Sequence, residues 1–221
     1  MKKSKIKNIG SFNHSSTLNA YIFLTALILL LSGCGGSSSG SDAPSDSMQG
    51  VFLDSPVAGV SYETETHSGT TDANGSFFYM EGEMIHFMLS DVFMGQATAA
   101  PVMTPIDIVP GATNSTHPTV TNMIRFMQTM DIDNNPDNGI TITQQVRNEI
   151  QGWRINFNQG IQEFEHDPEV VMFMDTLNTM NMFGDHREMV PVEQSRDHMD
   201  ETMSGDNHMG GGPPTGHMPT N

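Results

Sequence analysis

Residues 57–87, VAGVSYETETHSGTTDANGSFFYMEGEMIHF, decide the fold of the first half of this chain. Apolar and aromatic residues recur there in short runs, and polar or glycine-containing turns separate the runs. The clearest turn is Asp72-Ala73-Asn74-Gly75, because these residue types tolerate the backbone angles of a tight reversal. The pattern predicts short β-strands with one face in a core. The residues that punctuate these runs are Val57, Tyr62, Phe77, Tyr79, Ile85 and Phe87.

Three segments of this stretch form a recognisable series: Ala58-Gly59-Val60-Ser61-Tyr62, then residues 69–77 (GTTDANGSF), then Gly82-Glu83. The series resembles the carboxypeptidase-regulatory-like or transthyretin-like sandwich modules, in which a substituted strand precedes a T-D-x-x-G-x-F hairpin and a G-E turn. The resemblance implies a small β-sandwich with a structural rather than a catalytic role. We place this module at residues 50–103.

Beyond residue 104 the apolar positions take helical spacing. Pro118 suits the first turn of a helix, and Met123, Phe126, Met127 and Met130 then recur three or four residues apart. This spacing predicts a helix with an apolar face, so we expect these methionines to pack in a core rather than to bind metal.

Three further helices are predicted in a helical region at residues 104–203. Thr141-Ile142-Thr143-Gln144 has the form of a capping box that begins a helix toward Gly152. Asp167-Pro168 begins another, and the last runs from Pro191 to Met203. Their expected faces are Val170, Phe173, Met174, Leu177 and Asn181, and then Val192, Met199 and Met203. The predicted fold class is therefore α+β, similar to uncharacterised bacterial envelope lipoproteins in which small helices follow a β module.

The N-terminus predicts export. Four lysines precede an apolar run that is short for a membrane span and ends in Leu31-Ser32-Gly33-Cys34. This ending resembles the lipobox of bacterial lipoproteins, which implies a signal peptide at residues 1–33 and a lipid anchor on Cys34. Gly35, where retained lipoproteins carry Asp, implies the outer membrane of a Gram-negative bacterium. Residues 34–49 are rich in Gly and Ser and predict a flexible tether.

Cysteine and charge limit the function further. Cys34 is the single cysteine, so disulfides, Cys-based zinc sites and cysteine nucleophiles are excluded. All four lysines lie in the signal peptide, which leaves five arginines against 26 acidic residues. This charge argues against nucleic acid and anionic lipid surfaces as partners. It favours metal cations as partners, or simply a well-solvated surface.

Methionine replaces leucine almost completely after Cys34, with eighteen methionines against three leucines. A thioether fills a core about as well as a leucine side chain, but it is also oxidisable and a ligand for soft metals such as Cu(I). Three explanations follow: neutral replacement in the core, a reversible sink for oxidants, and soft-metal binding.

The soft-metal hypothesis rests mainly on a repeated His-Met dipeptide near the C-terminus. Residues 204–221 are rich in Gly, Pro and Asn and predict a disordered tail, so methionines there have no core to fill. Imidazole and thioether donors together suit Cu(I) or Ag(I). The predicted ligands are His198, Met199, Met203, His208, Met209, His217 and Met218.

A second candidate metal site lies between the first two predicted helices. Asp131, Asp133, Asn135 and Asp137 alternate as oxygen donors do in calcium loops. The glycine and bidentate glutamate that an EF-hand requires are missing from the corresponding positions. The loop is therefore either a non-EF calcium site or an Asx-rich turn after a helix.

No catalytic motif accompanies these features. The chain has no HExxH zinc motif and no phosphate-binding glycine loop, and its G-x-S-x-G match at residues 36–40 lies in the predicted tether rather than on a strand. We therefore predict a non-enzymatic envelope lipoprotein that captures or buffers Cu(I) or Ag(I). The alternative is a structural or adhesive surface module without a metal role, whose methionines pack or absorb oxidants.

Overall fold

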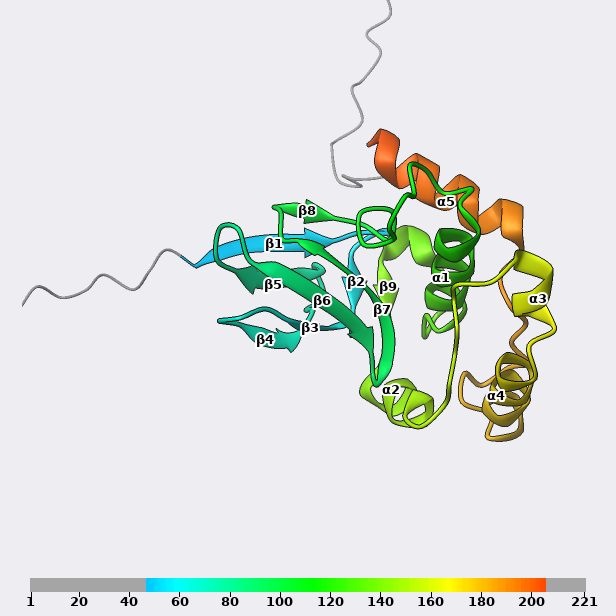
Figure 1. Ribbon diagram of the computed structural model, residues 1–221. Helices are drawn as coiled ribbons and strands as arrows, with labels where there is room; N and C mark the ends of the chain where they lie inside the picture. Colours follow the sequence, from blue (N-terminus) through cyan, green and yellow to red (C-terminus); the bar gives the residue numbers. More distant parts are fainter. Residues whose placement is uncertain (1–46, 206–221) are drawn as a thin grey trace, which may run out of the picture. The chain divides into compact units, whose positions relative to one another are not determined.

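The computed structural model describes residues 47–205 of the chain (Figure 1). This part of the chain contains nine β-strands and five α-helices, so the predicted α+β class is confirmed. The predicted signal peptide, the predicted lipid anchor at Cys34, and most of the predicted tether and tail fall outside the described residues. Strand β1 begins at Met48, two residues before the predicted start of the β module.

The strands form three small sheets. The first has the order β5-β1-β8, with β1 antiparallel to β5 and parallel to β8. The second has the order β4-β3-β6-β7 and is antiparallel throughout. The third joins β2 to β9 in parallel. The bounds are β1 Met48–Phe52, β2 Val57–Ala58, β3 Ser61–Glu63, β4 Ser68–Thr70, β5 Ser76–Tyr79, β6 Met84–Leu89, β7 Val92–Thr98, β8 Val102–Met103 and β9 Ile140–Thr141.

The turn predicted for this region is confirmed. The carboxylate of Asp72 accepts hydrogen bonds from the backbone N–H groups of Asn74 and Ser76, both at 2.9 Å, and Gly75 takes a positive φ of 72°. The six apolar residues that punctuate the predicted strands are all buried. Aromatic rings from both larger sheets meet there, since Phe52 of β1 lies 4.4 Å from Phe87 of β6, centroid to centroid.

The helices follow the predicted order with two differences. The bounds are α1 Pro118–Thr129, a short 3₁₀ helix η1 Pro136–Asn138, α2 Gln144–Ile150, α3 Ile161–Glu165, α4 Pro168–Thr179 and α5 Val192–Ser204. Thr143 rather than Thr141 caps α2, accepting a 3.3 Å bond from the N–H of Val146, because Thr141 belongs to β9. The five-residue α3 was not expected. None of the helices in residues 47–205 is long and apolar enough to cross a membrane.

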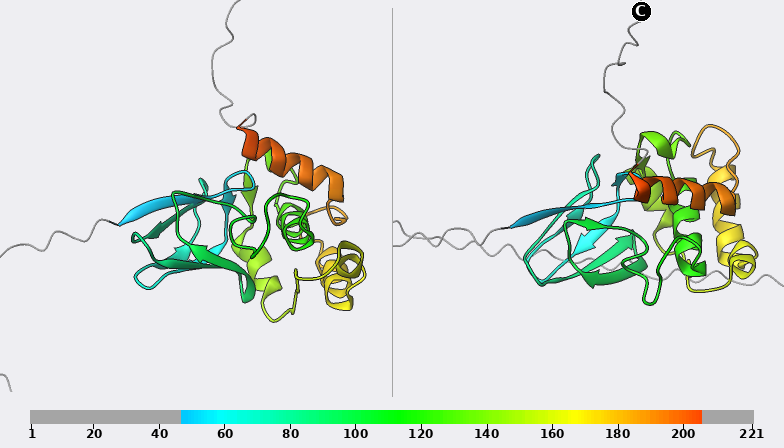
Figure 2. Two further views of the ribbon diagram at one scale, coloured as in Figure 1. Left: turned by 45° about the horizontal axis from the view of Figure 1, so that its top comes forward. Right: turned by 90° about the horizontal axis from the view of Figure 1, so that it is seen from above.

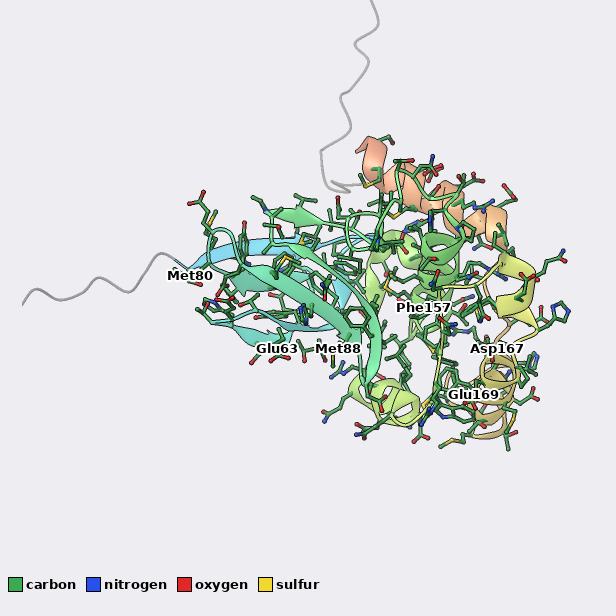
Figure 3. All side chains as sticks on the ribbon, in the orientation of Figure 1. Glu63, Met80, Met88, Phe157, Asp167 and Glu169 are labelled. Carbon is green, nitrogen blue, oxygen red and sulfur yellow. The ribbon has the colours of Figure 1, made fainter. Side chains whose placement is uncertain are left out.

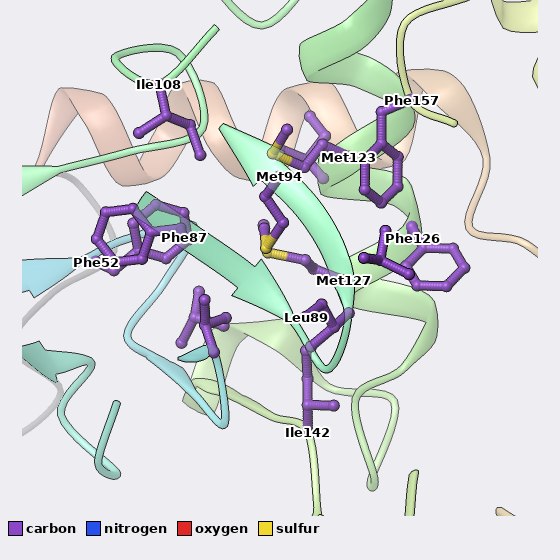
Figure 4. Close-up of a cluster of buried hydrophobic side chains, with 14 of the residues drawn as sticks. Phe52, Phe87, Leu89, Met94, Ile108, Met123, Phe126, Met127, Ile142 and Phe157 are labelled. Carbon is purple, nitrogen blue, oxygen red and sulfur yellow. The ribbon is translucent and has the colours of Figure 1, made fainter. Parts of the chain in front are cut away.

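Helix α1 is the centre of the fold. Its residues from Thr119 to Thr129 are all buried, because α3, α5 and the β part surround it (Figures 1 and 2). Figure 4 shows Met123 and Met127 of α1 meeting Met94 of β7, so sheet and helices share a single hydrophobic core. The prediction that the α1 methionines pack in a core is therefore confirmed.

Buried polar side chains of α1 form hydrogen bonds and an ion pair with the segments that surround the helix. Asn122 donates to the carbonyl oxygens of Phe157 and Gln159, at 3.0 and 2.9 Å. Arg125 donates to the carbonyl oxygen of Val190 at 2.7 Å and pairs with Glu165 of α3 at 2.8 Å. Each of these bonds satisfies a polar group that burial would otherwise leave unpaired, which is why a polar helix can occupy the core.

Arg187 closes the C-terminal end of α1. Its guanidinium donates to the carbonyl oxygens of Thr129 and Asp131, at 3.0 and 2.7 Å. The last carbonyls of a helix lack intrahelical partners and carry partial negative charge, so a cation suits this place. The guanidinium also lies 4.2 Å above the ring of Phe183. The segment between α4 and α5 is thereby held against α1.

Candidate functional site

A buried polar cluster joins the first strand to the last helix. Asp54 and Ser55 lie in the tight bend between β1 and β2, where Ser55 takes a positive φ of 63°. His198 of α5 places its Nε2 atom 3.0 Å from Ser55 Oγ and its Nδ1 atom 3.3 Å from a carboxylate oxygen of Asp137. Thr202, one turn further along α5, accepts a 3.3 Å bond from the Ser55 N–H.

The order of these contacts is that of a serine, histidine and aspartate triad. Ser55 is 0% exposed, so a substrate cannot reach its hydroxyl group for nucleophilic attack. The adjoining hollow, about 530 Å³, is lined by His198 and Asp137 but not by Ser55. A nucleophile must have room beside its oxygen for a reacting carbon. We therefore interpret the contacts of Ser55 with His198 and Thr202 as structural contacts that hold α5 against the bend after β1.

Asp54 is the most perturbed titratable group of the cluster. Its side chain is fully buried and accepts a 3.0 Å bond from the amide of Gln128 on α1. Burial raises the pKa of Asp54 to about 8, and the Gln128 bond opposes this only in part. Asp54 is therefore protonated at neutral pH, which removes the cost of placing a charge in the core.

The soft-metal ligands predicted on α5 lie in different surroundings. Met199 is completely buried in the hydrophobic core, and both ring nitrogens of His198 lie within bonding distance of protein oxygens. Met203 is 53% exposed although Met199, on the same predicted side of the helix, is completely buried, and Thr202 is buried as well. Adjacent residues of a helix point to different sides, which separates His198 from Met199. The predicted ligands His208, Met209, His217 and Met218 lie outside the described residues.

The acidic loop after α1 uses its oxygen atoms internally. The buried Asp131 carboxylate accepts bonds from the N–H groups of Thr141 and Asn135, at 2.8 and 2.9 Å. Asp133 accepts bonds from the Asn135 N–H and the Asn138 amide. Burial, chiefly, raises the pKa of Asp131 to about 6. These bonds are typical of an Asx-rich turn, while Asp137 faces His198. The calcium site stays a prediction.

The described methionines divide into three groups by burial. Six are buried in the core, five are half-buried, and five have exposed side chains. Neutral replacement of leucine explains the first group, since such swaps conserve volume. Neutral replacement of leucine does not explain the methionines with exposed side chains. That group comprises Met48, Met84, Met172, Met180 and Met203, between 38% and 59% exposed.

Sequence reasoning missed the Asp54 and Ser55 cluster entirely. Ser55 and His198 are 143 residues apart, and no local pattern predicts such a pairing. Within residues 47–205, no three His, Asp or Glu side chains converge to hold a metal ion. No protein-family model, no curated protein and no solved structure matches the chain.

Proposed function

We propose that this protein is a non-enzymatic lipoprotein of the bacterial outer membrane that captures or buffers Cu(I) or Ag(I) through methionine and histidine. The observation that carries the proposal is the exposed group of methionines. A methionine that is 38–59% exposed contributes less to the core than a buried one, and its accessible thioether is a ready ligand for a soft cation. The large excess of acidic residues adds a long-range attraction for any cation.

Each part of the chain has a role in this proposal. Cys34 anchors the protein in the membrane, and the tether holds the folded part away from it. The β module, sandwich-like in our proposal, and the helices form a stable carrier. Met203 lies in the last turn of α5, just before the glycine that ends the helix in a left-handed conformation. It is therefore placed to act together with His208, Met209, His217 and Met218.

The test is a Cu(I) titration of the mature soluble form, which starts after Cys34, against a chromophoric chelator that competes for the ion. A tail variant with His208→Gln, Met209→Leu, His217→Gln and Met218→Leu should weaken binding at least about tenfold, because a soft site loses affinity with each donor removed. The matched control is Met127→Leu, a buried swap of similar volume that should leave binding unchanged. Equal binding by the tail variant and the wild type would refute the role of the tail.

A sink for oxidants is the second function that the exposed methionines support. Exposed thioethers oxidise to sulfoxides more readily than buried ones, and reductases reverse the reaction. Mass spectrometry after mild peroxide treatment distinguishes the two functions. Under metal capture, bound Ag(I) should protect the ligand methionines from oxidation. Under the oxidant sink, Ag(I) should change nothing. A structural or adhesive module predicts neither metal binding nor selective oxidation.

A further inference from the structure

Strand β6 presents three soft donors on its outer face. Its residues alternate strictly between inside and outside. Ile85, Phe87 and Leu89 are all 0% exposed and face the core. Met84, His86 and Met88 occupy the opposite side, where Met84 is 42% exposed. An antiparallel sheet with one face in water ordinarily carries polar residues on that face. The two methionines beside His86 depart from this pattern, so their presence on the outer face needs an explanation other than packing.

The neighbouring strands build a shallow site around these donors. In the antiparallel register, Glu63 of β3 lies opposite His86, and Ser61 lies opposite Met88. A hollow of about 300 Å³ is lined by Glu63, His86 and Met88 together with Tyr62 and small residues of β3 and β4, and Met84 lies outside this lining. Figure 3 labels Glu63 and Met88 along the same edge of the β part. Directly opposed side chains on antiparallel strands have Cβ atoms about 5 Å apart, so the carboxylate is within reach of the imidazole.

Strand β7 lies beside β6 on the side opposite to β3 and contributes an aromatic side chain next to these donors. The β6–β7 register shifts between Phe87 and Met88, which is typical of a β-bulge, and Phe93 thereby lies opposite Met88 on the outer face. The Phe93 ring meets the His86 ring edge to face, with centroids 6.3 Å apart. This contact limits the orientations of the imidazole. Bulges frequently re-aim side chains next to functional sites.

The donors are free to coordinate. Among the residues that the structure describes, no hydrogen-bonding partner is found for either ring nitrogen of His86 or for the sulfur of Met88. The sulfur of Met84 accepts only a long bond, 3.7 Å, from the Thr98 hydroxyl. Alternate residues of a strand are about 6.8 Å apart, and an unbranched methionine with three rotatable side-chain bonds can cover the remaining distance to a shared ion.

We propose that Met84, His86 and Met88 form a Cu(I) or Ag(I) site on the outer face of the β4-β3-β6-β7 sheet. The inference deepens the proposed function and rests on the same soft-donor chemistry, but it places a site in the folded domain rather than in the tail. Two thioethers and a neutral imidazole match a cation that takes two to four soft ligands. Glu63 lies opposite His86 in the register, but no hydrogen bond joins the two in the described part of the chain, so the site is assigned to Met84, His86 and Met88 alone.

The test uses the full mature chain in four forms: wild type, the tail variant above, a strand variant with Met84→Leu, His86→Gln and Met88→Leu, and the combination. Cu(I) competition should show that the strand variant loses one equivalent of bound metal and that the tail variant keeps one. Methyl signals of labelled methionines should identify the site, since the first equivalent of Ag(I) in the tail variant should shift Met84 and Met88. The matched control, Met103→Leu with Met127→Leu, replaces two buried thioethers by side chains of similar volume and should change neither result.

The outcomes separate this inference from the proposed function. Full stoichiometry in the strand variant, with loss only in the tail variant, would overturn the β6 site and leave metal capture by the tail intact. Loss in the strand variant alone would support the β6 site and overturn the role of the tail. No binding by any form would overturn both. If the strand variant does not fold, the single exposed change His86→Gln replaces it, and it should weaken Ag(I) binding in the tail variant at least about tenfold.

Discussion

Raising the pH should destabilise the folded domain between pH 5.5 and 7.5, and Asp54 should be the main cause. Its carboxyl group has a pKa near 3.8 in the unfolded chain and about 8 in the folded protein. Between these values the folded state holds a proton that the unfolded chain has released. The stabilisation is therefore complete below pH 3.8 and is lost progressively as the pH rises toward 8.

The size of the effect follows from the burial of Asp54. One proton of difference changes the free energy of unfolding by up to about 1.4 kcal/mol per pH unit, so the loss from pH 5.5 to 7.5 is about 2.5 kcal/mol. For a domain of this size, that corresponds to a fall in Tm of about 5–10 °C. Asp131, whose pKa is raised to about 6, acts in the same direction but contributes mainly below pH 6.

Thermal unfolding followed by circular dichroism checks this prediction, with Asp54→Asn as the comparison. An asparagine keeps the shape and can accept the bond from Gln128, but it does not titrate. The difference in Tm between pH 5.5 and 7.5 should therefore shrink to a small remainder in the variant. A wild type with equal Tm at both pH values, or a variant with the same slope as the wild type, would refute the reasoning.

Two further predictions concern packing. Thr129→Val should lower the free energy of unfolding by about 1–3 kcal/mol in urea titrations, because the hydroxyl both accepts a bond from the Val190 N–H and donates to the Arg125 carbonyl. Thr176→Val on α4 removes a similar bond to the carbonyl four residues earlier at an exposed site, and a loss as large as that of Thr129→Val would contradict the argument. Gly59→Ala should cost more than about 2 kcal/mol, because φ is +98° and the added Cβ would collide with the Ile142 carbonyl oxygen. Gly111→Ala shares a positive φ but meets nothing within 4 Å, so it should cost about 1 kcal/mol, and equal losses for the two glycines would refute the collision.

Local patterns predicted much of the secondary structure. Pro118 and Asp167-Pro168 marked the starts of α1 and α4 correctly, because proline at the first turn and an aspartate cap are signals that a short segment carries by itself. The inward residues of β5 and β6 were equally readable from their alternation with polar residues. These features depend on neighbours within a few residues, which is the range over which sequence patterns are informative.

Features that depend on distant partners were not predictable. Strand β9 is two residues long and exists because β2 pairs with it, so the capping-box pattern at Thr141 predicted a helix start two residues too early. α3 has only five residues and shows too little periodicity to detect. The cluster around Ser55 requires α5 to fold back onto the first strand. In contrast, the donors on β6 were detectable, since M-x-H-x-M in a predicted strand places all three on one face.

The contacts between the bend after β1 and α5 join two segments that are synthesised at opposite ends of the described chain. Ser55 is among the first folded residues to leave the ribosome, and its partners His198 and Thr202 are among the last. The intervening chain can form local helices and hairpins early, but the native core cannot close until α5 has emerged, because contacts of long sequence separation form late. Under the proposed export, this delay would keep the chain unfolded and able to pass through a narrow membrane channel. Folding of the core thus depends on the last helix. A chain truncated before Val192 should therefore be more sensitive to proteases than the full chain.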